Sequence, residues 1–411
     1  MKVHILIRVS SIFIFVDCPQ TLFILSCLGA QEIISMIISR PPVTKLILSH
    51  NNLGDNGCNL LFKFLCSNVG RRKHILEIKL ANNGIEDQGL LAISEYLGGN
   101  EILKDLYIPQ NAFKNTPSVV STFTAALNAS HLEKLNLSSN RQLSDPFVAS
   151  FLPHLDTPHL RDLCLSITGL TPLSIPYIVS YISSPRCRLH NLSLNGNELG
   201  LQGVTDIIQA VEKSNFGLGK LELYSNQRSK HGVEEGEKEN EQVLKRALIR
   251  NQYLKRQVER EALGLLISAR PSLLRPKSIQ EVPSTSCPAS SPSQPPSLPT
   301  EVQLLILSFL APTLSNAQRI RIYTYASTFS TLPDLLPRLG SGGSRGGVGL
   351  SNPKHFGPLT GLSNFKSTGC LEGCIRGILC QREEERGRWL KLVGCDFYER
   401  EDMSGGDRQA G

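Results

Sequence analysis

One pattern recurs seven times between residues 43 and 226, and it constrains the fold of this chain more than any other feature. The pattern is L-x-x-L-x-L-x-x-N with small variations, and successive copies lie 32, 28, 29, 28, 29 and 29 residues apart. The copies begin at Val43, Ile75, Leu103, Leu132, Leu160, Leu189 and Leu218. A nearly constant period of this length predicts stacked units that share one continuous core.

Each copy predicts a short strand with two different faces. In residues 189–199, LHNLSLNGNEL, Leu192 and Leu194 are two apart, so both side chains point to the same face of an extended chain. Asn191, Ser193 and Asn195 then point to the other face. One face of the resulting sheet is therefore core, and the other is available to a ligand.

The last position of the motif is an amide side chain in almost every copy. A buried amide can satisfy the N–H and C=O groups that a turning backbone leaves unpaired, so these residues predict a ladder that runs from repeat to repeat. The ladder positions are Asn51, Asn83, Asn111, Asn140, Thr168, Asn197 and Asn226, with threonine as the one substitution. We expect Asn111 to lie buried at the centre of the ladder.

After each ladder position comes an apolar run at helical spacing, for example IEDQGLLAISEYL from Ile85. A strand followed by a full helix in 28 to 29 residues resembles the ribonuclease-inhibitor subclass of leucine-rich repeats. That resemblance implies an α/β horseshoe with a parallel sheet inside and helices outside. Proteins of this subclass bind other proteins for many purposes, so the resemblance implies a binding scaffold without naming the partner.

Charge favours a protein partner over nucleic acid. Residues 43–226 hold 15 Lys and Arg against 15 Asp and Glu, whereas residues 227–411 hold 25 against 19. The outward strand positions carry four positive and four negative charges, and a nucleic-acid interface would need clustered Lys and Arg. We expect a protein to bind this concave face, with Tyr107 and Tyr224 as aromatic anchors. The candidate partner-binding residues are Lys45, Lys79, Tyr107, Lys134, Asp162, Ser193 and Tyr224.

The segments that flank the array predict caps and a linker. Residues 1–42 contain an apolar helical pattern at 22–38 that suits an N-terminal cap, while residues 1–19 fit a disordered start, a signal peptide or an artefact of the gene start. Residues 227–275 begin with a charged loop and continue as an amphipathic helix over 241–269, which Pro271 should stop and which should cap the array. Residues 276–297 are a Ser/Pro-rich linker.

The segment after the linker, residues 298–339, predicts two short helices. Thr300 with Gln303 and Ser315 with Gln318 have the spacing of a capping box. The first helix carries L-P-x-E-V followed by ILSFL, which resembles the opening half of an F-box. That resemblance implies docking on the adaptor of a cullin-type ubiquitin ligase. The residues it implies for adaptor binding are Leu298, Pro299, Glu301, Val302, Ile306 and Leu310.

The second half of the segment departs from an F-box. Tyr323, Tyr325 and Ala326 stand where an F-box has its Val-Cys and Trp positions, and F-boxes usually precede their repeats. A repeat array with a C-terminal F-box-like segment resembles uncharacterised fungal proteins. Residues 340–411 should be a mostly disordered tail whose apolar patch at 389–395 folds back onto the helix pair.

No nucleotide, metal or nucleophile motif occurs in the sequence, so we expect no enzyme activity, no cofactor and no metal site. Neither apolar run near the N-terminus approaches the ~20 residues of a membrane span, so no membrane contact is expected. Eleven scattered cysteines favour a reducing compartment, the cytoplasm or the nucleus. Two alternatives to the adaptor function remain. One is a purely structural repeat protein, and the other is a regulator of a small GTPase, since Ran GTPase-activating proteins share this repeat subclass.

Overall fold

The computed structural model describes residues 3–9, 12–18, 27–39, 43–226, 235–273, 299–331 and 378–400. The chain divides into two compact units, Met1–Leu254 and Lys255–Gly411. The boundary falls inside one long helix. Each half of that helix is therefore described with its own unit.

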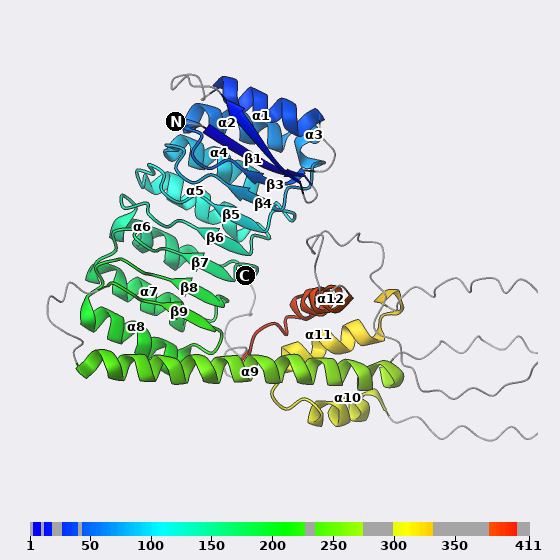
Figure 1. The fold of residues 1–411 in the computed structure, drawn as a ribbon. Coiled ribbons are helices and arrows are strands. Elements are labelled where there is room, and N and C mark those ends of the chain that lie inside the picture. The colour runs from blue at the N-terminus through cyan, green and yellow to red at the C-terminus, as the bar shows by residue number, and fades with distance from the viewer. Residues whose placement is uncertain are drawn as a thin grey trace, which may run out of the picture. The chain divides into compact units, whose positions relative to one another are not determined.

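The first unit is built on the predicted parallel sheet (Figure 1). Seven strands, one from each copy of the motif, pair with their sequence neighbours in parallel register. They are β3 (Val43–Ile47), β4 (Glu77–Lys79), β5 (Asp105–Tyr107), β6 (Lys134–Asn136), β7 (Asp162–Cys164), β8 (Asn191–Ser193) and β9 (Lys220–Glu222). The prediction of an α/β leucine-rich repeat fold is confirmed.

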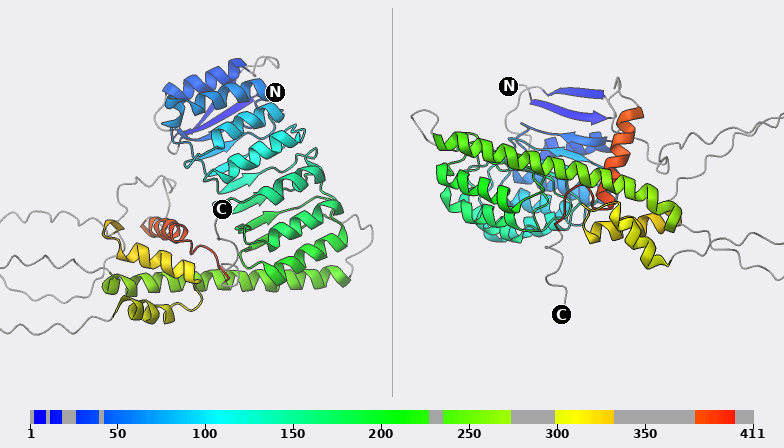
Figure 2. Two further views of the ribbon diagram at one scale, coloured as in Figure 1. Left: turned by 180° about the vertical axis from the view of Figure 1, so that it is seen from behind. Right: turned by 90° about the horizontal axis from the view of Figure 1, so that it is seen from below.

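Helices return the chain from each strand to the next and cover one face of the sheet, as Figures 1 and 2 show. They are α2 (Gly54–Cys66), α3 (Asn68–Arg71), α4 (Asp87–Leu97), α5 (Pro117–Asn128), α6 (Ser144–Phe151), α7 (Ile175–Ser183) and α8 (Gly200–Ser214), with 3-10 turns η1 (Leu152–His154) and η2 (Pro172–Ser174). The middle residue of each three-residue strand is buried between the sheet and these helices. Leu192 is 3% exposed and Leu194, directly after β8, is fully buried, as the alternation predicts.

The asparagine ladder forms as predicted. Asn83 Oδ1 accepts the backbone N–H groups of Asn51 at 3.1 Å and Leu53 at 3.4 Å, and the same arrangement recurs between later repeats. At Thr168 the ladder changes, because its hydroxyl donates to the Leu165 carbonyl at 2.7 Å. Each amide thus ties a turn to the turn of the preceding repeat, which holds the strands in register.

Asn111 differs from the prediction in its burial. Its side chain is only partly buried, whereas Asn83 is fully buried and Asn197 is 3% exposed. The reason is local, since the helix of this repeat starts later in the chain, at Pro117, and residues 112–116 form a longer loop around the ladder position.

The N-terminal segment differs from the three possibilities considered for residues 1–19. Strands β1 (Val3–Val9) and β2 (Ile12–Cys18) form an antiparallel hairpin, and β1 also pairs antiparallel with β3. The two strands therefore extend the sheet beyond β3. Helix α1 (Cys27–Ser39) packs Ala30, Ile33 and Ile37 fully buried in the core of the array.

Helix α9 (Glu235–Leu273) corrects the prediction for residues 227–275. It starts inside the charged stretch that was expected to be a loop, and it continues through Pro271 to Leu273. Proline at this point removes only a hydrogen bond of the last turn, so it does not stop the helix earlier. Within the first unit, Ala247 of α9 is 3% exposed and belongs to the array core.

Two neighbouring polar residues of α9 close the end of the array. The Arg250 guanidinium donates to the carbonyls of Val211 and Asn215 at 3.1 and 2.9 Å, at the C-terminal end of α8. Asn251, which is 2% exposed, donates to the carbonyls of Asn215 and Leu218 at 3.1 and 2.8 Å. These donors satisfy carbonyl groups that a further repeat would otherwise have covered.

The second unit has a core of its own. Helices α10 (Thr300–Phe309), α11 (Asn316–Ser327) and α12 (Ile378–Leu392), with the turn η3 (Phe329–Thr331), share it with the second half of α9. Within the tail that was expected to be mostly disordered, α12 is helical. Trp389, in the patch that was expected to fold back onto the helix pair, is 7% exposed with its ring 6.0 Å from that of Tyr325 on α11. The cap interpretation of the whole of α9 is therefore wrong, because its second half contributes Val258 and Leu265 to this other core.

Of the two predicted capping boxes, one is present. The Ser315 hydroxyl accepts the backbone N–H of Gln318, and the Gln318 side chain accepts that of Ser315, each at 3.1 Å. Helix α10 instead begins after Pro299 without a side-chain cap. Thr300 is the first residue of that helix rather than the residue before it, so its hydroxyl is not placed to cap.

Candidate protein-binding surfaces

The open face of the sheet carries two rows of side chains in register. Lys45, Glu77 and Asp105 lie side by side on β3, β4 and β5, and the row continues through Lys134 and Asp162. The second row contains Lys79, Tyr107 and Asn136, followed by Cys164, Ser193 and Glu222. The candidate partner-binding residues other than Tyr224 therefore share one surface.

Glu77 joins two of the candidate lysines. Its carboxylate lies 2.5 Å from Lys45 Nζ and 2.8 Å from Lys79 Nζ, and the residue is only 7% exposed. Burial by itself would raise the pKa of Glu77, but the hydrogen bonds and charges of the two lysines outweigh it and lower the pKa. Three charged groups are thus held together by one another.

Charges farther along the sheet are compensated in the same way. Lys134 Nζ lies 3.3 Å from Asp105, and Asn191 donates to Asp162 at 2.6 Å. Lys220 lies 2.5 Å from Glu222, which also accepts the Ser193 hydroxyl at 2.7 Å. The mixed face predicted from the sequence is therefore a network of neighbouring pairs without a block of one sign.

The two tyrosines occupy different places. Tyr107 is half-buried on β5 and has Lys79 Nζ 5.0 Å from its ring centre, a cation–π contact. Tyr224 lies two residues beyond β9 and is 73% exposed. Four strand spacings separate β5 from β9, roughly 19 Å, so one ligand must span most of the array to reach both rings.

Helix α10 of the second unit presents an apolar stripe to solvent. Val302, Ile306 and Leu310 are 38%, 49% and 52% exposed, whereas Leu307 on the other side of the helix is 4% exposed and belongs to the core. Leu305 and Phe309, at 58% and 75%, extend the stripe and were missed in the sequence. Their spacing from Val302 and Ile306 is the i, i+3, i+4 pattern that could have identified them.

Of the other candidate adaptor-binding residues, Pro299 and Glu301 are exposed at the start of α10. Leu298 lies outside the described residues. We call the surface formed by Val302, Leu305, Ile306, Phe309 and Leu310 the α10 stripe.

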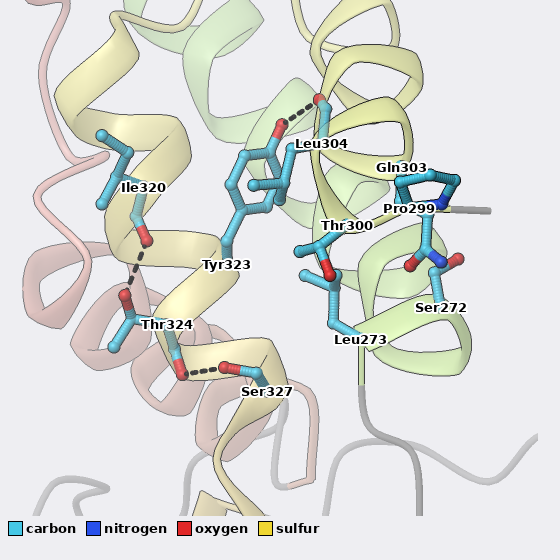
Figure 3. A pocket seen from close by; sticks show the side chains of 10 residues that line it. All are labelled: Ser272, Leu273, Pro299, Thr300, Gln303, Leu304, Ile320, Tyr323, Thr324 and Ser327. Carbon is cyan, nitrogen blue, oxygen red and sulfur yellow. Dashed lines mark hydrogen bonds between the residues drawn. The ribbon is translucent and has the colours of Figure 1, made fainter. Parts of the chain in front are cut away.

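A pocket of about 590 Å³ is lined by residues of α10, α11 and the end of α9, and the sequence had not indicated it (Figure 3). Its wall is apolar at Leu273, Leu304 and Ile320 and carries only uncharged polar groups elsewhere. Tyr323 closes one side, and its hydroxyl donates to the Leu304 carbonyl at 3.4 Å. The remaining lining residues are Ser272, Pro299, Thr300, Gln303, Thr324 and Ser327.

No group of three or more His, Cys, Asp or Glu side chains with the geometry of a metal site occurs in the described part of the chain. Among those residues, no helix is both long enough and apolar enough to cross a bilayer.

Comparison with protein families identifies the repeat. A model described as "Leucine Rich repeat" matches residues 41–62, 73–94 and 128–146, which include the strands β3, β4 and β6 and their asparagines. The chain carries leucine-rich repeats. All three matched segments precede Thr168, the ladder position that has no amide side chain.

Two curated relatives share the repeats. The chain is 28% identical to "NACHT, LRR and PYD domains-containing protein 13" of Homo sapiens over 227 residues, which is 48% of this chain and 21% of that protein. It is also 28% identical to "NACHT, LRR and PYD domains-containing protein 3" of Bos taurus over 224 residues, 47% of this chain and 21% of that protein. The chain thus spans about a fifth of the length of these relatives.

Among solved structures, the chain is similar to "Structural Genomics of Caenorhabditis elegans: tropomodulin C-terminal domain". The match covers 55% of this chain and 93% of that chain, with 14% sequence identity and a TM-score of 0.24. The family model and the two curated relatives support the leucine-rich repeats. They leave the F-box-like segment and the resemblance to fungal proteins as predictions from the sequence.

The leucine-rich repeats and the relatives that carry them support a role in protein interaction.

Proposed function

We propose that this chain is a protein-binding scaffold in which the leucine-rich repeat sheet holds one protein and the α10 stripe docks on a ubiquitin-ligase adaptor. The chain would then act as a substrate receptor without catalysing a reaction itself. The observation that supports protein binding on the sheet is the set of paired charges around Tyr107. Paired charges need little desolvation to meet a protein surface, whereas an unpaired cationic row would favour phosphate.

The observation that supports adaptor docking is the exposure of the α10 stripe. Five apolar side chains of one short helix face solvent, and Phe309 is 75% exposed. An isolated exposed apolar residue is ordinary, but a stripe on one helix face suits a groove in a partner. The exposure of these residues supports their resemblance to an F-box. A stripe that packed against other parts of the chain would instead be buried.

Changing Ile306 to lysine should abolish capture of the ligase adaptor by the full-length chain. A charge at the centre of the stripe would be buried without a partner in the complex, so we expect affinity to fall by at least a hundredfold. The measurement is surface plasmon resonance with the purified adaptor of a cullin-type ligase. Ile306 is 49% exposed, so the melting temperature should stay near that of the unaltered chain.

The matched control is Ile267→Lys, the same change at an isoleucine of α9 that is 72% exposed. It should leave adaptor binding intact. If the unaltered chain does not bind the adaptor, or if both variants lose binding equally, the adaptor function is wrong. A Ran-type GTPase should be tested with the unaltered chain in an assay of phosphate release, since stimulated GTP hydrolysis would favour the alternative of a GTPase regulator.

The double change Tyr107→Ala and Tyr224→Ala should weaken the complex on the sheet by tenfold or more. The aromatic anchors on β5 and just beyond β9 would each lose a ring that the complex buries. The partner is first identified by purification and mass spectrometry, and its dissociation constant is then measured by calorimetry with purified proteins.

Tyr177→Ala is the control for this double change, because Tyr177 is a 39% exposed tyrosine on α7, a helix that covers the opposite face. It should not alter the dissociation constant. Binding that survives the double change and is lost in the Tyr177 variant would place the partner on the helices. The melting temperature of the double variant should remain close to that of the unaltered chain, since Tyr224 is exposed and Tyr107 is half-buried.

A further inference from the structure

Helix α11 has one face that the core of the second unit leaves largely uncovered. Its residues Ile320, Tyr323, Thr324 and Ser327 lie three and four apart in the sequence, so they share one side of the helix. Ile320 is 53% exposed, Thr324 and Ser327 are exposed, and Tyr323 is only partly buried against the core. All four line the pocket of about 590 Å³ (Figure 3). The uncovered face of α11 is therefore one wall of this pocket.

Each of three helices contributes an aliphatic side chain to the pocket. Leu273 comes from the end of α9, Leu304 from α10 and Ile320 from α11. The ring of Tyr323 lies between α11 and α10, as Figure 3 shows. The volume of about 590 Å³ is within the range of roughly 300 to 1,000 Å³ that is typical of ligand pockets. The pocket can therefore hold the apolar body of a small molecule against three helices.

Four hydroxyl groups of the lining already donate their protons within the protein. A hydroxyl that donates still has a lone pair with which it can accept a hydrogen bond. A ligand that donates can thus bind without breaking these four bonds, whereas a ligand that accepts must compete with a backbone carbonyl. The four bonds run from Tyr323 to the Leu304 carbonyl at 3.4 Å, from Thr324 to that of Ile320 at 3.0 Å, from Ser327 to that of Thr324 at 3.1 Å and from Ser272 to that of Ser268 at 3.2 Å.

Charge further limits what the pocket can bind. None of the ten described residues that line it carries a charged side chain. A charged ligand would give up water there without gaining a counter-charge from the lining. The Gln303 amide can donate or accept, so it does not decide the class of ligand. The hydroxyl groups and the lack of charge together favour an uncharged ligand that donates a hydrogen bond.

We propose that this pocket binds an uncharged aromatic molecule with a hydrogen-bond donor, of the class of the phenols. Its ring lies against the three aliphatic side chains and the ring of Tyr323, since aromatic rings pair favourably in offset or edge-to-face contact. Its hydroxyl donates to the oxygen of Tyr323 or Thr324 on α11. The residues that α10 contributes to the pocket, Thr300, Gln303 and Leu304, are not those of the α10 stripe, so the inference does not depend on the proposed function.

The test compares three small probes with the full chain at pH 7, by titration in saturation-transfer NMR. The probes are para-ethylphenol, its methyl ether para-ethylanisole, which cannot donate, and the anion para-ethylbenzoate. We expect a dissociation constant of about 1 mM for the phenol, as is ordinary for a ligand of its size. The ether should bind about fivefold more weakly because it lacks the donor, and the anion at least tenfold more weakly.

Thr324→Trp should lower the affinity for the phenol at least tenfold, because the larger side chain fills the pocket from an exposed position. The matched control is Asn316→Trp, the same substitution at an exposed residue of α11 outside the pocket. It should leave the affinity unchanged. Binding of the phenol that is equal in these two variants would overturn the proposal, and so would a lack of binding to the unaltered chain.

A second variant tests the hydrogen bond without filling the pocket. Tyr323→Phe combined with Thr324→Val keeps the shape of the wall but removes two acceptor oxygens. It should reduce the affinity for the phenol to that for the ether and leave the affinity for the ether unchanged. If the ether binds the unaltered chain as tightly as the phenol, or if the double variant keeps its preference for the phenol, the assignment is wrong. Ile306→Lys should bind the phenol normally, and a loss there would place the probe on the α10 stripe instead of in the pocket.

Discussion

Replacing Asn111 with alanine should lower the free energy of unfolding of the repeat array by about 3 kcal/mol. The side chain makes five hydrogen bonds. Its oxygen accepts the backbone N–H groups of Asn83 and Ile85 at 3.1 and 3.2 Å, and its amide donates to the carbonyls of Leu80, Ile108 and Pro109 at 3.0 to 3.2 Å. Alanine removes the acceptor of the Asn83 and Ile85 N–H groups and the donor to the Leu80 carbonyl, and water compensates only in part at this partly buried position. The carbonyls of Ile108 and Pro109 keep the Asn140 amide and the Asn82 N–H as donors.

Thr168→Ala is the matched change at the one ladder position without an amide. It removes the short hydrogen bond from the Thr168 hydroxyl to the Leu165 carbonyl at 2.7 Å and a long one to Asn197 Oδ1 at 3.5 Å, so we expect a loss of about 1 kcal/mol. The backbone N–H of Thr168 keeps its acceptor, Asn197 Oδ1 at 2.9 Å. Urea unfolding followed by circular dichroism compares the two variants. Equal losses would mean that the ladder amides contribute no more than an ordinary buried hydroxyl.

Replacing Gln318 with alanine should destabilise the second unit by about 3 kcal/mol. Gln318 is fully buried and connects α11 to the segment after α12. Its amide donates to the carbonyls of Gly394 and Phe397 at 2.8 and 2.9 Å, while its oxygen accepts the backbone N–H of Ser315 at 3.1 Å. Without the side chain, the buried Ser315 N–H and the partly buried carbonyls of Gly394 and Phe397 lose their hydrogen bonds to Gln318.

Trp389 makes this change measurable in one unit alone. It is the only tryptophan in the chain, and it lies 7% exposed in the core of the second unit. Its fluorescence during urea unfolding should shift to a lower midpoint in the Gln318→Ala variant. Gln318→Met preserves most of the volume but none of the hydrogen bonds, so it should lose nearly as much.

Thr324→Ala provides a baseline, because Thr324 is exposed and its hydroxyl bonds only to the Ile320 carbonyl of its own helix, at 3.0 Å. A change of less than about 0.5 kcal/mol is expected there. If Gln318→Met is as stable as the unaltered chain, the hydrogen bonds to residues 394 and 397 do not hold the second unit together.

The repeat array could be predicted from the sequence almost completely. Its signals are local, since the alternation around Leu192 and Leu194 defines which face of a strand is buried, and the asparagine that follows defines the turn. Stacking then brings equivalent residues of neighbouring repeats together, so register on the sheet follows from the spacing. The same reasoning identified the open face on which Tyr107 and the candidate lysines lie.

The local sequence pattern was insufficient to predict the structure where a segment packs against more than one distant part of the chain. The apolar residues of α9 have the spacing of one continuous helix face. Ala247 nevertheless belongs to the core of the array, whereas Leu265 belongs with Trp389 to the core of the second unit. Strands β1 and β2 pair with each other, and β1 also pairs with β3 at the edge of the sheet. Their own sequence does not show that this edge is available. Such contacts join residues far apart in the chain, and periodicity within a window carries no information about them.

The sequence alone determined the repeat, its parallel sheet and the residue types available for binding, because short-range alternation and spacing specify them. Only the tertiary structure decided which charges neutralise one another, as in Glu77 between Lys45 and Lys79. It also decided that Leu307 turns inward while Phe309 faces solvent. The reason is that pairing and exposure depend on distances between side chains of different repeats and helices, and these distances exist only once the elements are packed.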